Sequence, residues 1–235
     1  MQRTMRDYVL LEQIGSTGLA TVYRAADPLR GQEVALKVLR PYICADEALM
    51  ERFSREMERV ARLRHPNILS VYATEADGPR RWITMQYVLW PTLRQWLQQP
   101  IPAVKAMTIL RQVAEAVEAA HREGISHGDI KPGNIFLDPE TGQVLLSDFG
   151  MALLGEGISP GMKPFLNTPL PTYMAPERSH GVSPNLQSDV YSLGVLLYDM
   201  LTGTVPFSGL DPATVQTRQL SSAARPPSQV NPDVP

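Results

Sequence analysis

HGDIKPGN at residues 127–134, followed by DFG at residues 148–150, is the most informative part of this sequence. The two motifs are separated by a short apolar segment that suits a hairpin. Asp129 can accept the proton of a hydroxyl group, and Lys131 can neutralise charge on a phosphoryl group as it moves. These residue types, at this spacing, predict a site for phosphoryl transfer.

Two further residues of these motifs suit a metal ion. Asn134 ends the first motif and Asp148 opens the second, and both carry the oxygen atoms that Mg²⁺ prefers. Together the motifs resemble the eukaryotic-like protein kinase family. Lys131, two residues after Asp129, matches its serine/threonine branch. The resemblance implies a bilobal α+β fold, MgATP as the phosphoryl donor and a protein serine or threonine hydroxyl as the acceptor.

Composition narrows the class of protein. The chain has 235 residues, of which 43% are hydrophobic, enough for the core of one large domain or two small lobes. Its 22 basic and 24 acidic residues imply no polyanionic partner, so nucleic acid is not expected. The single cysteine, Cys44, excludes an internal disulfide framework. No signal peptide or membrane segment is predicted, which favours a cytoplasmic protein or the cytoplasmic domain of a longer membrane protein.

Organisation along the chain changes near residue 90. Before that point, branched and aromatic runs of strand length occur at residues 8–14, 21–25, 33–39, 68–73 and 82–87. One helix is expected among them, at residues 46–64, because Leu49, Phe53, Met57 and Val60 form an apolar stripe.

After residue 90 the pattern is mainly helical. A second stripe is expected at Val104, Met107, Leu110, Ala114, Val117 and His121. A small sheet lobe at residues 1–87, a hinge at 88–92 and a larger helical lobe at 93–235 follow from these patterns and from the resemblance.

Residues 14–22, IGSTGLATV, form a degenerate version of the glycine-rich loop. Only Gly15 and Val22 match the pattern G-x-G-x-x-G-x-V, since Thr17 and Ala20 replace glycines and Gly18 stands one place late. Taken by itself, this segment is an ordinary hairpin turn. Its position before the strand that carries Lys37 favours a loop that covers phosphate groups, with Ile14 beside the nucleotide.

The resemblance also assigns nucleotide-binding roles in the smaller lobe. Lys37 would reach the α- and β-phosphates and would be steadied by Glu56 on the expected helix. Met85 would be the gatekeeper beside the adenine pocket, and the backbones of Gln86 and Val88 would bind the base. The apolar walls around adenine would be Val22, Ala35 and Phe136.

Three residues near the catalytic motifs have expected structural roles. His127 is expected to pack under Phe149 rather than act as a base. Asp189 lies in an apolar helix, where a carboxylate needs several hydrogen-bond donors, and is expected to anchor the catalytic loop. Gly128 stands where the family commonly has an arginine that grips a phosphorylated activation loop, so activation by such a phosphate is not favoured.

Downstream motifs separate protein kinases from small-molecule kinases, which share the His-Gly-Asp triplet. MAPE at residues 174–177 and SDVYSLG at 188–194 resemble the end of an activation segment and the helix after it. Candidate phosphoacceptors before them are Ser159, Thr168, Thr172 and Tyr173. Leu170 occupies a position where relatives have threonine, so Thr168 is expected to take that role with a small bulge, or else the substrate platform differs.

A helix is expected at residues 211–220, followed by a Pro-rich end. The family normally continues with two more helices, one of which supplies an arginine for the glutamate equivalent to Glu177, so the lobe is interpreted as C-terminally truncated. A nucleotide-binding pseudokinase is the main alternative function, and a small-molecule kinase is another. Homodimerisation through the smaller lobe is a further expectation from the resemblance.

Overall fold

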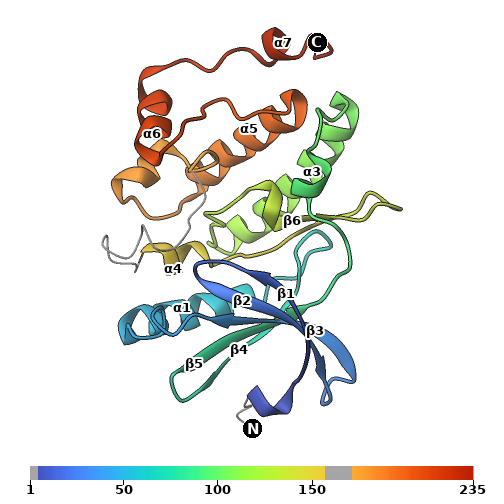
Figure 1. The fold of residues 1–235 in the computed structure, drawn as a ribbon, viewed down its shortest axis with the longest axis vertical. Helices are drawn as coiled ribbons and strands as arrows, with labels where there is room; N and C mark the ends of the chain where they lie inside the picture. The colour runs from blue at the N-terminus through green and yellow to red at the C-terminus, as the bar shows by residue number, and fades with distance from the viewer. Residues whose placement is uncertain (1–4, 157–170, 235) are drawn as a thin grey trace. The chain divides into compact units, whose positions relative to one another are not determined.

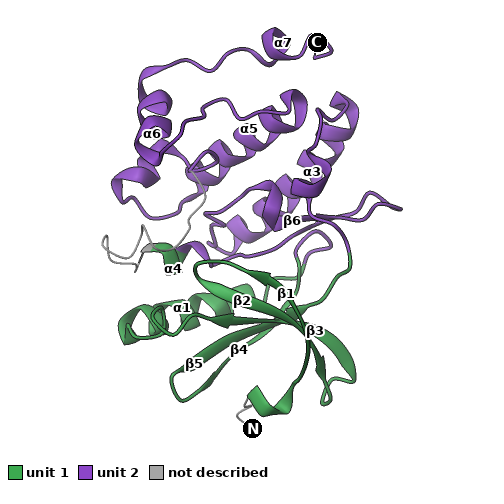
Figure 2. Ribbon diagram, viewed as in Figure 1, with its two compact units in different colours: residues 1–64, 69–89, 153–168 green, residues 65–68, 90–152, 169–235 purple. Residues whose placement is uncertain are grey.

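The computed structural model describes residues 5–156 and 171–234, which form two compact units (Figure 2). The described part of unit 1 comprises residues 5–64, 69–89 and 153–156. Unit 2 comprises residues 65–68, 90–152 and 171–234. The division into residues 1–87, 88–92 and 93–235 stays a prediction.

Unit 1 is built on a five-stranded antiparallel sheet with the strand order β1-β2-β3-β5-β4 (Figure 1). A short 3-10 helix, η1 (Met5–Asp7), precedes it. The strands are β1 (Val9–Ser16), β2 (Ala20–Asp27), β3 (Gln32–Leu39), β4 (Val71–Asp77) and β5 (Arg80–Gln86). All five runs of the sequence pattern therefore contribute strands.

The start of the fourth strand was predicted wrongly. β4 begins at Val71, whereas Ile68 forms an isolated parallel bridge with Leu146 of unit 2, to which Ile68 itself belongs. The Leu146 amide donates to the Asn67 carbonyl at 2.8 Å, and the Asn67 side chain donates to the Val144 carbonyl at 2.8 Å. These bonds hold Ile68 within unit 2, outside the five-stranded sheet.

The helix of unit 1, α1 (Glu47–Val60), follows the predicted stripe. Asp46 caps it by accepting a hydrogen bond from the Leu49 amide at 3.0 Å. All four stripe residues are buried, and α1 packs against β4. The helix ends at Val60, four residues before the predicted end, and continues as turns closed by bonds such as Leu63 amide to Val60 carbonyl.

The two faces of the sheet carry different residues. One face holds a core cluster of Tyr8, Ala25, Val34, Leu36 and Trp82. Because side chains alternate along a strand, Ala35 and Lys37 of β3 lie on the opposite face. Their cross-strand partners Met85 and Val22 share that face. Val22, Ala35, Lys37 and Met85, four of the predicted nucleotide contacts, are thus on one side of the sheet.

Unit 2 is mainly helical. Its helices include α2 (Leu93–Trp96), α3 (Ala103–Arg122), α5 (Leu186–Thr202), α6 (Pro212–Ser221) and α7 (Pro227–Val230), and α4 (Ala152–Glu156) begins in it. A hairpin of β6 (Ile135–Leu137) and β7 (Val144–Leu146) and two 3-10 helices, η2 (Pro132–Asn134) and η4 (Pro176–His180), complete it. The α+β class is confirmed.

The predicted stripe of α3 was wrong in its phase, and Val117 alone of its residues is buried. Val104 is 83% exposed and Met107 is 52% exposed. The buried residues of this helix are Ala106, Ile109, Val113, Ala116, Val117 and Ala120. α3 carries two apolar stripes, and the buried one is rich in alanine; the helix packs against α5 and β7.

The last predicted helix is confirmed as α6, whose N-terminus is capped by Asp211 through the Thr214 amide at 2.8 Å. Within residues 5–156 and 171–234, no helix combines the length and the apolar character needed to cross a bilayer.

Candidate active site

The hairpin of unit 2 brings the two predicted metal ligands to one end. Ile135 of β6 pairs with Leu146 of β7, so Asn134, just before β6, and Asp148, just after β7, leave the hairpin on the same side. Ser147 fixes this arrangement. Its amide donates to the Asn134 carbonyl at 2.9 Å, and its hydroxyl donates to the same oxygen at 3.1 Å.

Asp129 is surrounded by two side-chain donors from its own loop. Lys131 Nζ lies 2.6 Å from Asp129 Oδ2, and Asn134 Nδ2 donates to the same oxygen at 3.0 Å. Asn134 Nδ2 also donates to the Asp129 carbonyl at 2.8 Å. One carboxylate oxygen is therefore held in place. The carboxylate remains partly exposed, at 38% for the side chain, so a hydroxyl group can approach it.

The chemistry of Asn134 and Asp148 fits Mg²⁺. Both hydrogen bonds of Asn134 use its amide nitrogen, which turns its amide oxygen away from Asp129. Asp148 has a φ of 70°, and it is the sole non-glycine residue with positive φ in the described ranges. Such backbone costs about 1–3 kcal/mol and recurs at functional sites. A carboxylate and an amide oxygen with room for water and phosphate are the ligands that Mg²⁺ takes.

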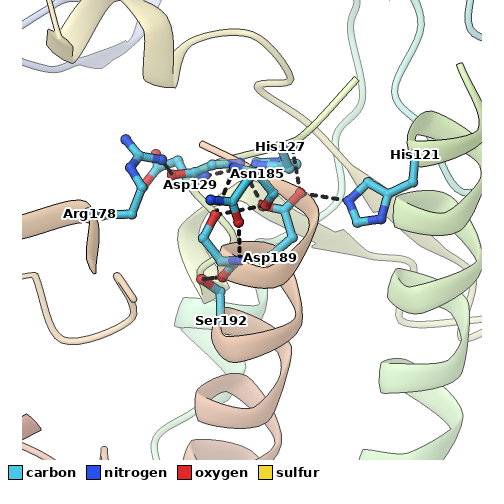
Figure 3. Close-up of polar contacts among 9 residues, drawn as sticks. His121, His127, Asp129, Arg178, Asn185, Asp189 and Ser192 are labelled. Atoms are coloured by element: carbon cyan, nitrogen blue, oxygen red, sulfur yellow. Dashed lines mark hydrogen bonds and ion pairs between the residues drawn. The ribbon is translucent and has the colours of Figure 1, made fainter. Parts of the chain in front are cut away.

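Asp189 anchors the loop that carries Asp129, as predicted. It is completely buried on α5 and accepts hydrogen bonds from the His127 amide at 2.7 Å and the Gly128 amide at 2.8 Å. His121 Nε2 of α3 lies 2.8 Å from Asp189 Oδ2 (Figure 3). These three hydrogen-bond partners satisfy the carboxylate, which explains how an acid can be buried on an apolar helix.

His127 has the predicted structural role. Its ring lies 4.5 Å from that of Phe149, centroid to centroid, and the side chain is completely buried. Nδ1 accepts from the Asp129 amide at 3.1 Å, so Nε2, which lies 2.8 Å from the Ser147 carbonyl, carries the proton. Burial lowers the pKa of His127, which keeps the ring neutral in this tautomer.

Gly128 occupies a place with no room for a side chain. Its φ is 73°, and a Cβ atom there would lie 2.7 Å from the Ala152 Cβ and 2.8 Å from the Pro184 Cβ. An arginine at this position would need the surrounding backbone to move. The absence of that arginine, noted from the sequence, therefore has a packing reason.

Arg178 and His121 are site residues that the sequence analysis did not predict. Arg178 of η4 donates to the Gly128 carbonyl at 3.2 Å, one residue before Asp129 (Figure 3). Its place directly after the MAPE motif was the available signal. For His121, the signal was a polar residue within an apolar stripe. Arg178 joins η4 to the catalytic loop directly, whereas His121 joins α3 to Asp189, the residue that anchors the loop.

In unit 1, the predicted nucleotide contacts follow two rows across the sheet. Gly15 pairs with Val22, and Val22 pairs with Lys37, which places these residues side by side on β1, β2 and β3. Ala35 pairs with Met85 on β5. Lys37 is only 7% exposed, so the strand does not present it to bulk solvent as an edge residue would.

Other predicted contacts are placed as follows. Glu56 of α1 forms an ion pair with Arg59 at 2.8 Å, and its pairing with Lys37 stays a prediction. The Gln86 amide donates to the Ser70 carbonyl at 2.9 Å, so this amide is already hydrogen-bonded within unit 1. Ile14 on β1 is 43% exposed, Val88 follows β5, and Phe136 lies on β6. The convergence of Lys37 with Asp129 and Asp148 stays a prediction.

The end of the segment after DFG is tied to α5. The Tyr173 hydroxyl donates to Asp199, and the Ser192 hydroxyl donates to the Tyr173 carbonyl at 2.8 Å. Burial and the neighbouring carboxylate raise the pKa of Tyr173, so its phenol stays protonated. Within the described ranges, Glu177 pairs with no arginine. The candidate residues Ser159, Thr168 and Leu170 lie outside the described residues.

The chain is similar in sequence to known protein kinases. The protein kinase domain model matches residues 8–234. PrkC of Bacillus subtilis, a serine/threonine-protein kinase, is 34% identical over 232 residues, covering 97% of this chain and 35% of its own. PknB of Mycobacterium leprae, also a serine/threonine-protein kinase, is 36% identical over 228 residues, covering 94% and 36%. This chain spans about a third of the length of these relatives.

A solved structure agrees with the sequence relatives. The kinase domain of Mycobacterium tuberculosis PknI superposes with a TM-score of 0.75 at 29% identity, covering 99% of this chain and 85% of that one. The fold is thus that of protein kinases. With the family model, the curated relatives and the fold in agreement, the chain belongs to the protein kinase domain family.

Proposed function

We propose that this chain is the catalytic domain of an ATP-dependent protein serine/threonine kinase. The observation that carries the proposal is the loop in which Lys131 and Asn134 both hold Oδ2 of Asp129, itself anchored through Asp189. A pseudokinase needs no ordered base with this set of partners. The relatives named above support the serine/threonine class for this chain.

Asp129 would act as the base. Its carboxylate accepts the proton of a serine or threonine hydroxyl as that oxygen attacks the γ-phosphorus of ATP. The bond between the γ-phosphorus and the bridging oxygen breaks, and ADP leaves. Lys131 lies beside the same carboxylate and would neutralise the charge on the transferring group.

Asn134 and Asp148 would hold Mg²⁺, which supplies charge neutralisation for the phosphates when bound. Lys37 would bind the α- and β-phosphates, with Glu56 as its partner. Met85, Gln86, Val88, Val22, Ala35 and Phe136 would surround the adenine, and Ile14, Gly15 and Gly18 would lie over the nucleotide. Homodimerisation through unit 1 remains part of the proposal as an expectation from the family.

The test is transfer of the labelled γ-phosphoryl group from ATP with Mg²⁺ to the chain itself or to a generic basic protein. Asp129→Asn should reduce labelling by about 10²–10⁴-fold, the usual contribution of a positioned base, while MgATP binding persists. Asp233→Asn, an exposed change from acid to amide in the same unit, is the matched control and should label normally.

Three outcomes separate the candidate functions. Labelling that survives in Asp129→Asn contradicts the assigned base. MgATP binding without labelling in the wild-type chain supports the pseudokinase alternative. ATP consumption that requires a small metabolite, with no protein labelling, supports a small-molecule kinase.

A further inference from the structure

The loop between β1 and β2 is closed by its own threonine. Thr17 Oγ1 accepts hydrogen bonds from the amides of Leu19 and Ala20, each at 3.2 Å. The Thr17 amide donates to the Ala20 carbonyl at 2.8 Å, and the Thr17 hydroxyl lies 3.3 Å from that carbonyl. The hydroxyl therefore occupies the donors of two successive residues of the loop.

Residues after β3 hold the carbonyl groups of the same loop. The Arg40 amide donates to the Leu19 carbonyl at 2.9 Å, and the Tyr42 hydroxyl donates to the Gly18 carbonyl. The Arg40 guanidinium donates to the Ser16 hydroxyl at 2.7 Å. These contacts fix the peptide planes from outside the loop, so the amides of Leu19 and Ala20 have a set direction.

A loop of this kind binds phosphate through backbone amides, because successive N–H groups form a concave donor set for an anion. Here a neutral hydroxyl oxygen already accepts from two of those amides. A triphosphate must displace it to use them. Thr17 departs from the glycine pattern of the family, which has no side chain at this position.

We propose that Thr17 is an affinity-determining residue that weakens the binding of nucleotide phosphates by occupying the Leu19 and Ala20 amides. This inference rests on the proposed function, because it concerns the ATP site of a kinase. The effect is confined to the phosphate groups. Adenosine, which has no phosphate, does not compete with the hydroxyl and binds independently of Thr17.

A pair of variants separates the hydroxyl from the shape of the side chain. Thr17→Val removes the hydroxyl and keeps the branched shape, whereas Thr17→Ser keeps the hydroxyl. The binding of MgATP and of adenosine is measured by calorimetry for the wild-type chain and both variants. We expect MgATP to bind Thr17→Val about five- to tenfold more tightly, since two neutral hydrogen bonds no longer compete.

The remaining expectations define the test. Thr17→Ser should bind MgATP within about twofold of the wild-type chain, and adenosine should bind all three chains equally. Equal or weaker MgATP binding by Thr17→Val, with adenosine binding intact, overturns the role of Thr17 and leaves the proposed function standing. Absence of MgATP and adenosine binding from every chain overturns both proposals. If Thr17→Val does not fold, Thr17→Ala provides the same comparison with a smaller side chain.

Discussion

The catalytic loop, residues 127–134, and the phosphate loop, residues 14–22, are held by different kinds of contact. The catalytic loop is fixed by buried groups from other elements, namely Asp189 of α5 and the Ser147 carbonyl after β7. The phosphate loop is fixed mainly by exposed side chains, namely Thr17 within the loop and Tyr42, which lies 24 residues after Gly18. Hydrogen bonds therefore hold both loops, but the side chains that make them are buried at the catalytic loop and exposed at the phosphate loop.

The energetic consequence follows from burial. A buried donor that loses its acceptor costs about 1–3 kcal/mol, because no water replaces the lost partner. An exposed donor that loses its acceptor is hydrated instead, and the cost is small. We therefore expect substitutions in the catalytic loop to change stability and substitutions in the phosphate loop to change nucleotide affinity.

The largest effect is expected for Asp189→Ala. The change leaves the amide of buried His127 and the amide of half-buried Gly128 without an acceptor, and we expect the free energy of unfolding to fall by about 3–5 kcal/mol. Urea unfolding followed by circular dichroism measures this loss. Asp233→Ala, an exposed acid in the same unit, should stay within about 0.5 kcal/mol of the wild-type chain. A similar stability for both variants would contradict the anchor.

A smaller loss is expected for Gly128→Ala, with Gly142→Ala as its matched control. Both glycines have φ near 70°, but only Gly128 has atoms within 3 Å of an added Cβ. Gly142→Ala should cost about 1–2 kcal/mol for its backbone alone. Gly128→Ala should cost about 1–3 kcal/mol more, for the overlap with Ala152 and Pro184. Equal losses in urea unfolding would show that packing does not require Gly128.

The pH dependence of stability should report the buried ring of His127. Its folded-state pKa is lowered, so below about pH 6.5 the unfolded chain takes up a proton that the folded chain does not. The contribution is fully present above that pH and is lost as the pH falls, by at most about 1.4 kcal/mol per pH unit. Urea unfolding at pH 8 and pH 5.5 measures it. The decrease should shrink in His127→Gln, and an unchanged decrease would assign it to other groups.

The smallest effect on stability is expected in the phosphate loop. Tyr42→Phe removes the hydrogen bond to the Gly18 carbonyl, and because Tyr42 is 39% exposed the loss should be below about 1 kcal/mol. Thermal unfolding measures this change. A loss above about 2 kcal/mol would place this loop in the same energetic class as the catalytic loop.

Local patterns predicted much of the fold because their signal lies within a few residues. The stripe of α1 was predicted correctly, since Leu49, Phe53, Met57 and Val60 are its only strong apolar row. The stripe of α3 was predicted with the wrong phase, because that helix has two apolar rows and only packing against the rest of unit 2 selects which one is buried. The start of β4 was predicted wrongly for a similar reason, since Asn67 and Ile68 are bonded to β7 within unit 2 and not to the sheet.

The site residues also divide into those that local sequence motifs identify and those that only the tertiary structure identifies. The sequence motifs identified Asp129, Lys131, Asn134 and Asp148, and an acid in an apolar helix pointed to the anchoring role of Asp189. Arg178 and His121 were missed, because Arg178 meets the catalytic loop and His121 meets its anchor Asp189 from other elements, and no spacing along the chain records those contacts.

The sequence by itself determined the family, the order of the motifs and the chemistry of the catalytic loop, because residue type and short spacing carry that information. Only the tertiary structure decided which row of α3 is buried, why residue 128 is glycine, and which donors satisfy Asp189. These outcomes depend on distances between segments remote in the chain, where a few ångströms of packing determine whether a side chain fits.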